Sequence, residues 1–164
     1  MGWISRLFSP SKTTDKKHYG GWPEVKQVLI LFDNHKDLVH ALAQKWADEG
    51  KEVNLIYWKT PAPKKDLRKD CFTEKDIRFG KIINTKFDKH WNDGVLFDFT
   101  ISTHKRLQRL LAVSSFDFMA GINGAHKSHY DLFTPYVDGK FESCLNTVES
   151  YIKIINSNKN TVSL

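Results

Sequence analysis

Blocks of apolar residues with two different periods run along the chain and predict strands and helices in alternation. The uninterrupted apolar run Val28 to Phe32 ends at Asp33-Asn34, as is typical of a central parallel strand that is buried on both faces. From Asp37 the apolar residues recur at helical intervals until Gly50, a residue that favours a helix end. A second run, Val53 to Trp58, follows, so this segment predicts a strand–helix–strand unit.

The second half of the chain continues this alternation. Val95 to Thr100 is another apolar run, and Ser102 or Thr103 could cap the helix that follows it. Phe116 to Ala120 leads into a flexible loop and predicts a further strand. Between residues 59 and 94 the pattern is weak, and only a short strand within residues 72–79 is expected.

The last elements complete a layered fold. Tyr130 to Val137 could form an edge strand, because Pro135 would be costly in a central one. Apolar residues from Glu142 to Asn156 share one face of a final helix. The order of elements predicts one three-layer α/β domain with a doubly wound, mostly parallel sheet of the Rossmann or flavodoxin type, in which the edge strand could be antiparallel.

Both ends of the chain lack this periodicity. We expect an N-terminal basic and aromatic arm over residues 1–24, the α/β domain over residues 25–157 and a flexible tail over residues 158–164. Four apolar side chains of the arm share one helical face, which could contact a partner, a membrane surface or the domain itself. These residues are Trp3, Ile4, Leu7 and Phe8.

Charge and cysteine content narrow the class of protein. The net charge of +6 and the pI of about 9.2 permit attraction to nucleic acid, anionic lipid or acidic proteins. The two cysteines, Cys71 and Cys144, lack metal-site spacing and favour a reducing compartment, and no apolar run is long enough to span a bilayer. We therefore expect a cytoplasmic protein with no cofactor. A basic run that could bind a partner, or could simply be solvated, contains Lys64, Lys65, Arg68 and Lys69.

Several short segments carry a family resemblance through their order and spacing. They are Val28–Asp33, Phe72–Asp76, Phe79–Lys81, Val95–Asp98 and Leu110–Gly121, followed by the C-terminal helix. In these segments the chain resembles an uncharacterised family of small Rossmann-like α/β proteins from Bacteroidota. The resemblance implies a small bacterial cytoplasmic protein, and it carries over no catalytic residue.

Two aspartates mark a candidate site at the ends of predicted strands. In a doubly wound sheet, ligands bind at the carboxyl ends of the strands where the strand order reverses, and the usual order places Asp33 and Asp98 there. The pair could hold Mg²⁺ or act as acid and base on a phosphorylated small molecule, or each could merely cap a loop or helix. The stretch Asp33 to Asp37 lacks the glycines of a dinucleotide site.

Cations and histidines supply two further sets of candidates. Cations in the first turn of the helix after Thr103 oppose the helix dipole, and a bound anion would relieve that conflict. The candidates for anion binding are Thr103, Lys105, Arg106, Arg109, Asn123 and Gly124. His126 and His129 form a metal candidate if they lie on a helix, with Asp131 orienting one ring, and surface histidines are the alternative.

Three hypotheses for function follow from these features. The first is a non-enzymatic binding or adaptor protein that contacts a protein complex or an anionic polymer such as RNA, since no constellation completes a reaction. The second is a Mg²⁺-dependent enzyme, or a sensor of a phosphorylated small molecule, that uses Asp33 and Asp98. The third is a peripheral membrane factor that binds through residues 1–8.

Overall fold

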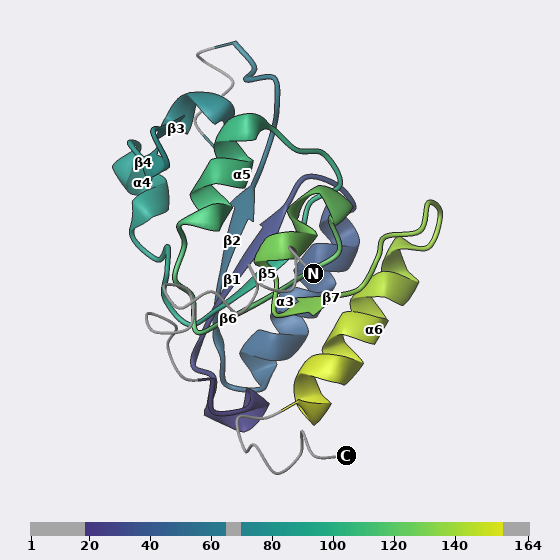
Figure 1. Ribbon diagram of the computed structural model, residues 1–164. Coiled ribbons are helices and arrows are strands. Elements are labelled where there is room, and N and C mark those ends of the chain that lie inside the picture. Colours follow the sequence, from purple (N-terminus) through teal and green to yellow (C-terminus); the bar gives the residue numbers. More distant parts are fainter. Residues whose placement is uncertain (1–18, 65–69, 156–164) are drawn as a thin grey trace, which may run out of the picture.

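The main sheet is parallel throughout and has the strand order β2-β1-β5-β6-β7. The computed structural model describes residues 19–64 and 70–155 (Figure 1). The strands of the sheet are β1 (Gln27–Phe32), β2 (Glu52–Tyr57), β5 (Val95–Phe99), β6 (Phe118–Gly121) and β7 (Leu132–Phe133). The strand order reverses between β1 and β5, so these neighbouring strands define the position where ligands bind in folds of this type.

Helices cover both faces of the sheet (Figure 1). They are α3 (Lys36–Asp48), α4 (Thr85–Asp88), α5 (Lys105–Ala112) and α6 (Phe141–Ile154), with the 3₁₀ helices η1 (Trp22–Glu24), η3 (Glu74–Asp76) and η4 (Gly124–His129). Helices α3 and α6 pack on one face, and α5 packs on the other. The predicted three-layer α/β fold is therefore confirmed.

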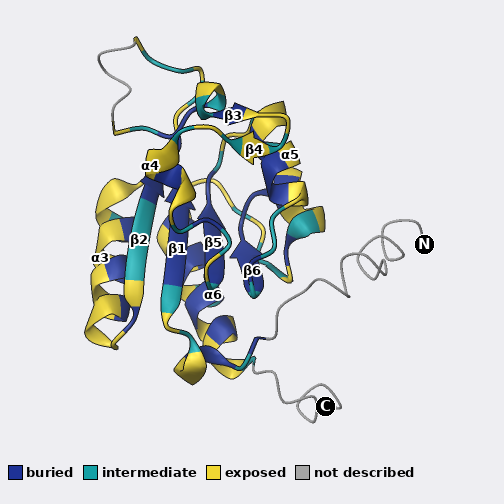
Figure 2. Ribbon diagram, turned by 90° about the vertical axis from the view of Figure 1, so that its left-hand side faces the viewer, coloured by how far each residue is buried: buried dark blue, intermediate teal, exposed yellow. Residues whose placement is uncertain are grey.

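Strand β1 shows why its sequence is apolar without interruption. Val28 and Ile30 belong to the core cluster beneath α3 and α6. Leu29 and Leu31 point to the opposite face and belong to the cluster beneath α5. Because successive side chains of a strand alternate between faces, a strand covered on both sides needs apolar residues at every position. In Figure 2 this strand is accordingly buried along most of its length.

The edge of the sheet differs from the expected arrangement in one respect. Strand β7 is the edge strand, but it runs parallel to β6, with Leu132 opposite Ala120. The backbone N–H of Asp131 donates to the carbonyl of Met119, so the segment after β6 has brought the chain back beside β6 before β7 begins. Antiparallel pairing occurs instead in a separate hairpin, β3 (Ile77–Arg78) with β4 (Lys81–Ile82), which lies within the weakly patterned segment of residues 59–94.

The core begins earlier in the chain than the predicted domain boundary at residue 25. Tyr19 and Trp22, which the sequence places in the arm, are buried against the α3/α6 face. The Tyr19 hydroxyl donates to the carbonyl of Ile152 in α6. Both aromatic side chains therefore pack on the apolar surface formed by α6 and the sheet, and their burial stabilises the fold.

Several predicted contact residues lie outside the described part of the chain. They are Trp3, Ile4, Leu7, Phe8, Lys65, Arg68 and Lys69, together with the tail over residues 158–164. Lys64, which is described, is exposed. None of the helices within residues 19–64 and 70–155 combines the length and the apolar character needed to cross a bilayer.

Candidate functional site

The carboxyl ends of β1 and β5 lie side by side, as the predicted strand order requires. Leu31 of β1 is in register with Asp98 of β5, and Asp33 follows the next residue of β1. Asp98 is fully buried, whereas Asp33 is partly exposed. The structure therefore brings the two aspartates to one edge of the sheet but places them in different environments.

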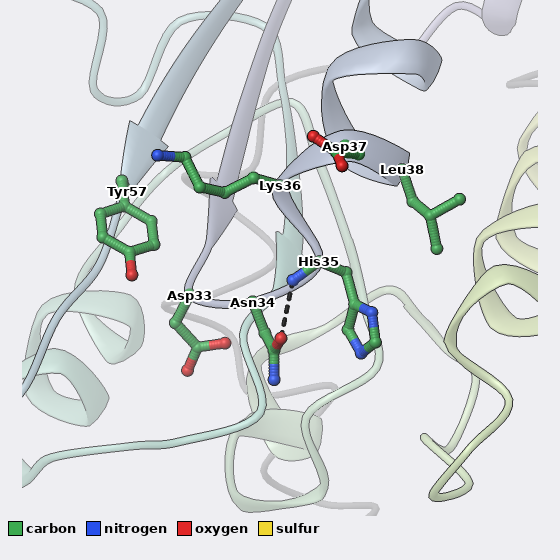
Figure 3. A pocket seen from close by; sticks show the side chains of 7 residues that line it. All are labelled: Asp33, Asn34, His35, Lys36, Asp37, Leu38 and Tyr57. Atoms are coloured by element: carbon green, nitrogen blue, oxygen red, sulfur yellow. Dashed lines mark hydrogen bonds between the residues drawn. The ribbon is translucent and has the colours of Figure 1, made fainter.

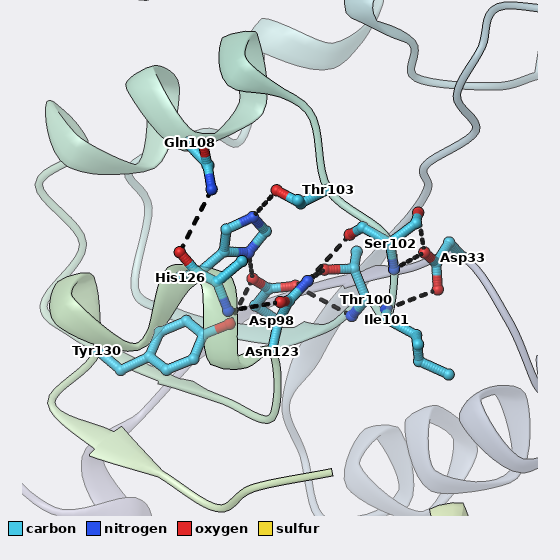
Figure 4. A network of polar contacts seen from close by, with 11 residues as sticks. Asp33, Asp98, Thr100, Ile101, Ser102, Thr103, Gln108, Asn123, His126 and Tyr130 are labelled. Carbon is cyan, nitrogen blue, oxygen red and sulfur yellow. Dashed lines mark hydrogen bonds and ion pairs between the residues drawn. The ribbon is translucent and has the colours of Figure 1, made fainter. Parts of the chain in front are cut away.

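Asp33 holds the loop that follows β5 (Figure 4). Its Oδ1 accepts a hydrogen bond of 3.0 Å from the backbone N–H of Ile101, and its Oδ2 accepts one of 2.8 Å from that of Ser102. The Ser102 hydroxyl also donates to Oδ2. Both carboxylate oxygens thus cap the loop, which is the structural role that the sequence left open.

Asp98 is the centre of a buried polar network. Its Oδ1 accepts hydrogen bonds from the backbone N–H of Thr100 at 3.0 Å and from the Thr100 hydroxyl at 2.6 Å. Its Oδ2 lies 2.6 Å from the Tyr130 hydroxyl and 2.7 Å from Nδ1 of His126. These four contacts satisfy a buried carboxylate within the chain, so Asp98 has no oxygen free for a metal ion.

The same network fixes the roles of His126. Burial, followed by the charge of Asp98, raises the pKa of Tyr130 well above its usual value, so its hydroxyl stays protonated and donates. A carboxylate can only accept, which makes Nδ1 of a neutral His126 a donor and its Nε2 an acceptor. Nε2 is hydrogen-bonded to the hydroxyl of Thr103.

The histidine pair that the sequence offered as a metal candidate is not built as one. Both ring nitrogens of His126 are engaged, with Asp98 and Thr103. His126 lies in η4 and is fully buried, so the alternative of a surface histidine does not hold for it either. Within the described ranges no three His, Cys, Asp or Glu side chains gather as a ligand set.

The start of α5 also differs from the prediction. The N-cap is His104, whose Nδ1 accepts from the backbone N–H of Arg106 at 3.1 Å, rather than Ser102 or Thr103. Both predicted caps have hydroxyls that are engaged elsewhere, Ser102 with Asp33 and Thr103 with His126. Hydrogen bonds to residues distant in sequence therefore replace the helix cap that the local sequence predicts.

Asn123 and Gly124, two of the anion candidates, lie beside the buried network. The Asn123 amide donates to the Thr100 hydroxyl at 3.0 Å and to the carbonyl of Ser102 at 2.9 Å. Its Oδ1 accepts from the backbone N–H of Ala125 and thereby caps η4. The Asn123 side chain consequently connects the loops after β5 and β6, and its amide is not turned toward solvent.

A recess beside the β1 end occupies about 540 Å³ (Figure 3). Its lining residues are Asp33 to Leu38 and Tyr57. Asp33 already caps the neighbouring loop, and the ammonium of Lys36 lies 5.4 Å from the centre of the Tyr57 ring. The lining carries both signs of charge, so it favours neither an anion nor a cation.

A second recess occupies about 300 Å³, and because the charged residues that line it are all arginines, we call it the arginine cleft. It is lined by Arg78, Phe79, Gly80, Arg106 and Arg109. The first three residues come from the β3–β4 hairpin and the last two from α5. Arg106 is anchored, because its guanidinium donates to the carbonyls of Glu74 at 2.8 Å and Ile77 at 3.3 Å.

The two other arginines of the cleft are free to meet a ligand. Arg78 and Arg109 are exposed, and neither has a carboxylate partner within residues 19–64 and 70–155. Phe79, which follows Arg78 and also lines the cleft, has 90% of its surface exposed. Its φ of 53° is in the left-handed region that side chains other than glycine rarely adopt.

The structure thus joins part of the predicted anion set to residues that the sequence analysis did not select. Arg106 and Arg109 line the cleft, whereas Thr103 and Asn123 belong to the buried network. Phe79 was missed because an apolar residue is expected to be buried. The available signal was its position between Arg78 and a glycine, which is typical of a tight turn.

Comparisons with known proteins add no functional information. The resemblance to a family of Bacteroidota proteins stays a prediction. A scan against protein-family models found no match, and a search of curated proteins found no similar sequence.

Proposed function

We propose that this chain is a binding protein for single-stranded RNA and that the arginine cleft is its binding site. The observation that carries the proposal is the exposed aromatic ring of Phe79 among three arginine side chains. This arrangement supplies charge for a phosphate backbone and a flat apolar surface for a base.

The charge of the cleft supports an anionic polymer as the ligand. Guanidinium groups bind phosphate oxygens in pairs of parallel hydrogen bonds and remain charged at every physiological pH. Arg78 and Arg109 have no competing carboxylate in the described part of the chain, so their charges are not neutralised internally. The net charge of +6 adds a long-range attraction for the same ligands.

Phe79 supports an unpaired base rather than a duplex. Burying such a ring normally stabilises a protein by about 1.5–3 kcal/mol, yet here the ring is left in water. A non-glycine residue in the left-handed region costs a further ~1–3 kcal/mol, and the two-residue turn between β3 and β4 places Phe79 there. A stacked base would cover the ring, whereas the faces of paired bases are already stacked within a duplex.

The contacts of the structure do not favour the alternative that uses Asp33 and Asp98. Asp98 has both oxygens engaged and is fully buried. Asp33 has both oxygens engaged by the loop after β5. A Mg²⁺ ion or a phosphorylated ligand would have to break these contacts before it could bind.

The test is the affinity for a fluorescently labelled oligouridine, measured by anisotropy over a range of salt concentrations. We expect Phe79→Gly to weaken binding about tenfold, because stacking one base contributes ~1–3 kcal/mol. Arg109→Gln should weaken binding and reduce the slope of log affinity against log salt by about 1, since one phosphate contact is lost.

Two control variants match these changes in chemistry. Ile83→Ala removes an apolar side chain that is half exposed outside the cleft, and Lys140→Gln removes an exposed cation at the start of α6. Both should bind like the unchanged protein. Equal binding by Phe79→Gly and the unchanged protein, or tighter binding of the corresponding duplex, would overturn the proposal.

A further inference from the structure

Hydrogen bonds connect a hydroxyl, an imidazole and a carboxylate in a row at the carboxyl edge of the sheet (Figure 4). The Thr103 hydroxyl is hydrogen-bonded to Nε2 of His126, and Nδ1 of the same ring lies 2.7 Å from Oδ2 of Asp98. Thr103 is exposed, whereas His126 and Asp98 are fully buried. The hydroxyl of this hydrogen-bonded row therefore reaches solvent, and the carboxylate lies in the core.

The contacts around Asp98 determine which group donates and which accepts in each hydrogen bond. Thr100 and Tyr130 donate to the carboxylate, which leaves Asp98 as an acceptor only. Nδ1–H of His126 therefore donates to Asp98, and in a neutral ring Nε2 accepts the hydroxyl proton of Thr103. This tautomer is the one in which an imidazole acts as a general base toward a hydroxyl.

We infer that Thr103 is an acyl-accepting nucleophile that His126 activates and Asp98 orients. The three elements that supply these residues are β5, the loop after it and η4. The inference goes beyond RNA binding, because Thr103 and His126 do not line the arginine cleft. The class of substrate is an ester or thioester with a small acyl group, which an exposed hydroxyl can reach without a deep pocket.

The acylation step needs only the ester, and the deacylation step that follows needs water. The Thr103 oxygen forms a bond to the carbonyl carbon while its proton moves to Nε2 of His126. The bond from that carbon to the leaving oxygen then breaks, and the leaving oxygen takes the proton from Nε2. Water repeats the sequence on the acyl-threonine ester, which regenerates the hydroxyl and releases a carboxylic acid.

The start of α5 suits the charge that develops in this step. The helix begins at Lys105, two residues after Thr103, and no acidic residue occupies its first turn. The positive end of a helix dipole and a lysine ammonium both stabilise a negatively charged oxygen nearby. The cations that conflict with the dipole in the free protein would thus favour the transition state.

The experiment exposes the 164-residue chain to p-nitrophenyl acetate and follows both nitrophenolate release and the mass of the protein. In samples quenched before water hydrolyses the ester, we expect one acetyl group per chain, located on Thr103 by peptide mapping. Thr103→Ser should keep the reaction, and Thr103→Val, which has nearly the same shape, should abolish it. Thr147→Val removes a hydroxyl of α6 that is partly exposed and donates to the carbonyl of Ser143, with no histidine partner, and it should change nothing.

The role of the imidazole has its own test. His126→Gln should reduce the rate of acetylation at least tenfold, because the base that takes the Thr103 proton is lost. Thr103→Ser and Thr103→Val alter an exposed residue, so the result does not depend on whether His126→Gln folds. Acetylation that spares Thr103, or that proceeds equally in a folded His126→Gln variant, would overturn the inference.

Discussion

Two polar regions of this protein follow opposite rules. In the Asp98 network the carboxylate and imidazole are fully buried, and each has its partners within the chain. In the arginine cleft the aromatic ring and two guanidinium groups face solvent without such partners among the described residues. Polar residues that the fold satisfies hold loops in place, whereas those that it leaves unsatisfied are the ones available to a macromolecular ligand.

The difference predicts where substitutions act. A change in the network should lower the free energy of unfolding, because it leaves a buried donor or acceptor without a partner. A change at Phe79 or Arg109 should lower affinity for RNA and leave the fold intact, because both side chains are exposed and line the cleft. The following substitutions sharpen this contrast, from the largest expected effect to the smallest.

Asp98→Asn should destabilise the protein by about 3–5 kcal/mol, because His126 and Tyr130 would lose a buried acceptor for their protons. Urea denaturation followed by circular dichroism measures this change. Asp70→Asn provides the matched control, since that carboxylate is 82% exposed in its ion pair with Lys86. Its cost should stay below about 1 kcal/mol, and equal costs for the two variants would contradict a structural role for Asp98.

Gly121→Ala should destabilise the protein by about 1–3 kcal/mol through overpacking. A Cβ at this position would lie 2.3 Å from Cζ of Tyr130 and 2.6 Å from its hydroxyl oxygen, so the ring would have to move away from Asp98. Thermal unfolding of the variant gives the measurement. Gly124→Ala adds the same methyl group where no atom lies within 4 Å, and its stability should be unchanged. An equal loss in both variants would argue against this close contact.

Phe79→Gly should raise the free energy of unfolding by about 1 kcal/mol, because glycine adopts the left-handed backbone without strain. The same variant is expected to lose affinity for RNA. If the free energy of unfolding rises while the affinity for RNA falls, Phe79 contributes to ligand binding and not to the stability of the fold. A measurable loss of stability in urea denaturation would instead show that Phe79 supports the fold.

Periodicity along the chain was sufficient to predict the layers of the fold. The apolar run of β1 fits burial on both faces, and the neighbouring positions of Asp33 and Asp98 follow from the strand order alone. The β3–β4 hairpin could not be predicted in detail, because two-residue strands have no measurable period. The arginine cleft depends on that hairpin meeting α5, a contact between segments that are distant in sequence.

The polar network shows a different limit of sequence-based prediction. Ser102 and Thr103 have the chemistry of helix caps, and only the tertiary structure reveals that their hydroxyls have other partners. His126 follows a glycine-containing loop, as surface histidines often do, yet it is buried against Asp98. The choice between local and distant partners is made by three-dimensional packing, which a single sequence does not encode in any short pattern.

The central claim, that RNA binds at the arginine cleft, is tested most directly by photocrosslinking to a short oligomer that contains 4-thiouridine. Peptide mapping then locates the crosslinked residues. We predict adducts on residues 78–81, where Phe79 would stack on a base, and their loss in Phe79→Gly. Adducts confined to the basic segment 64–69, with the Phe79→Gly variant crosslinking equally well, would contradict the assignment of the cleft.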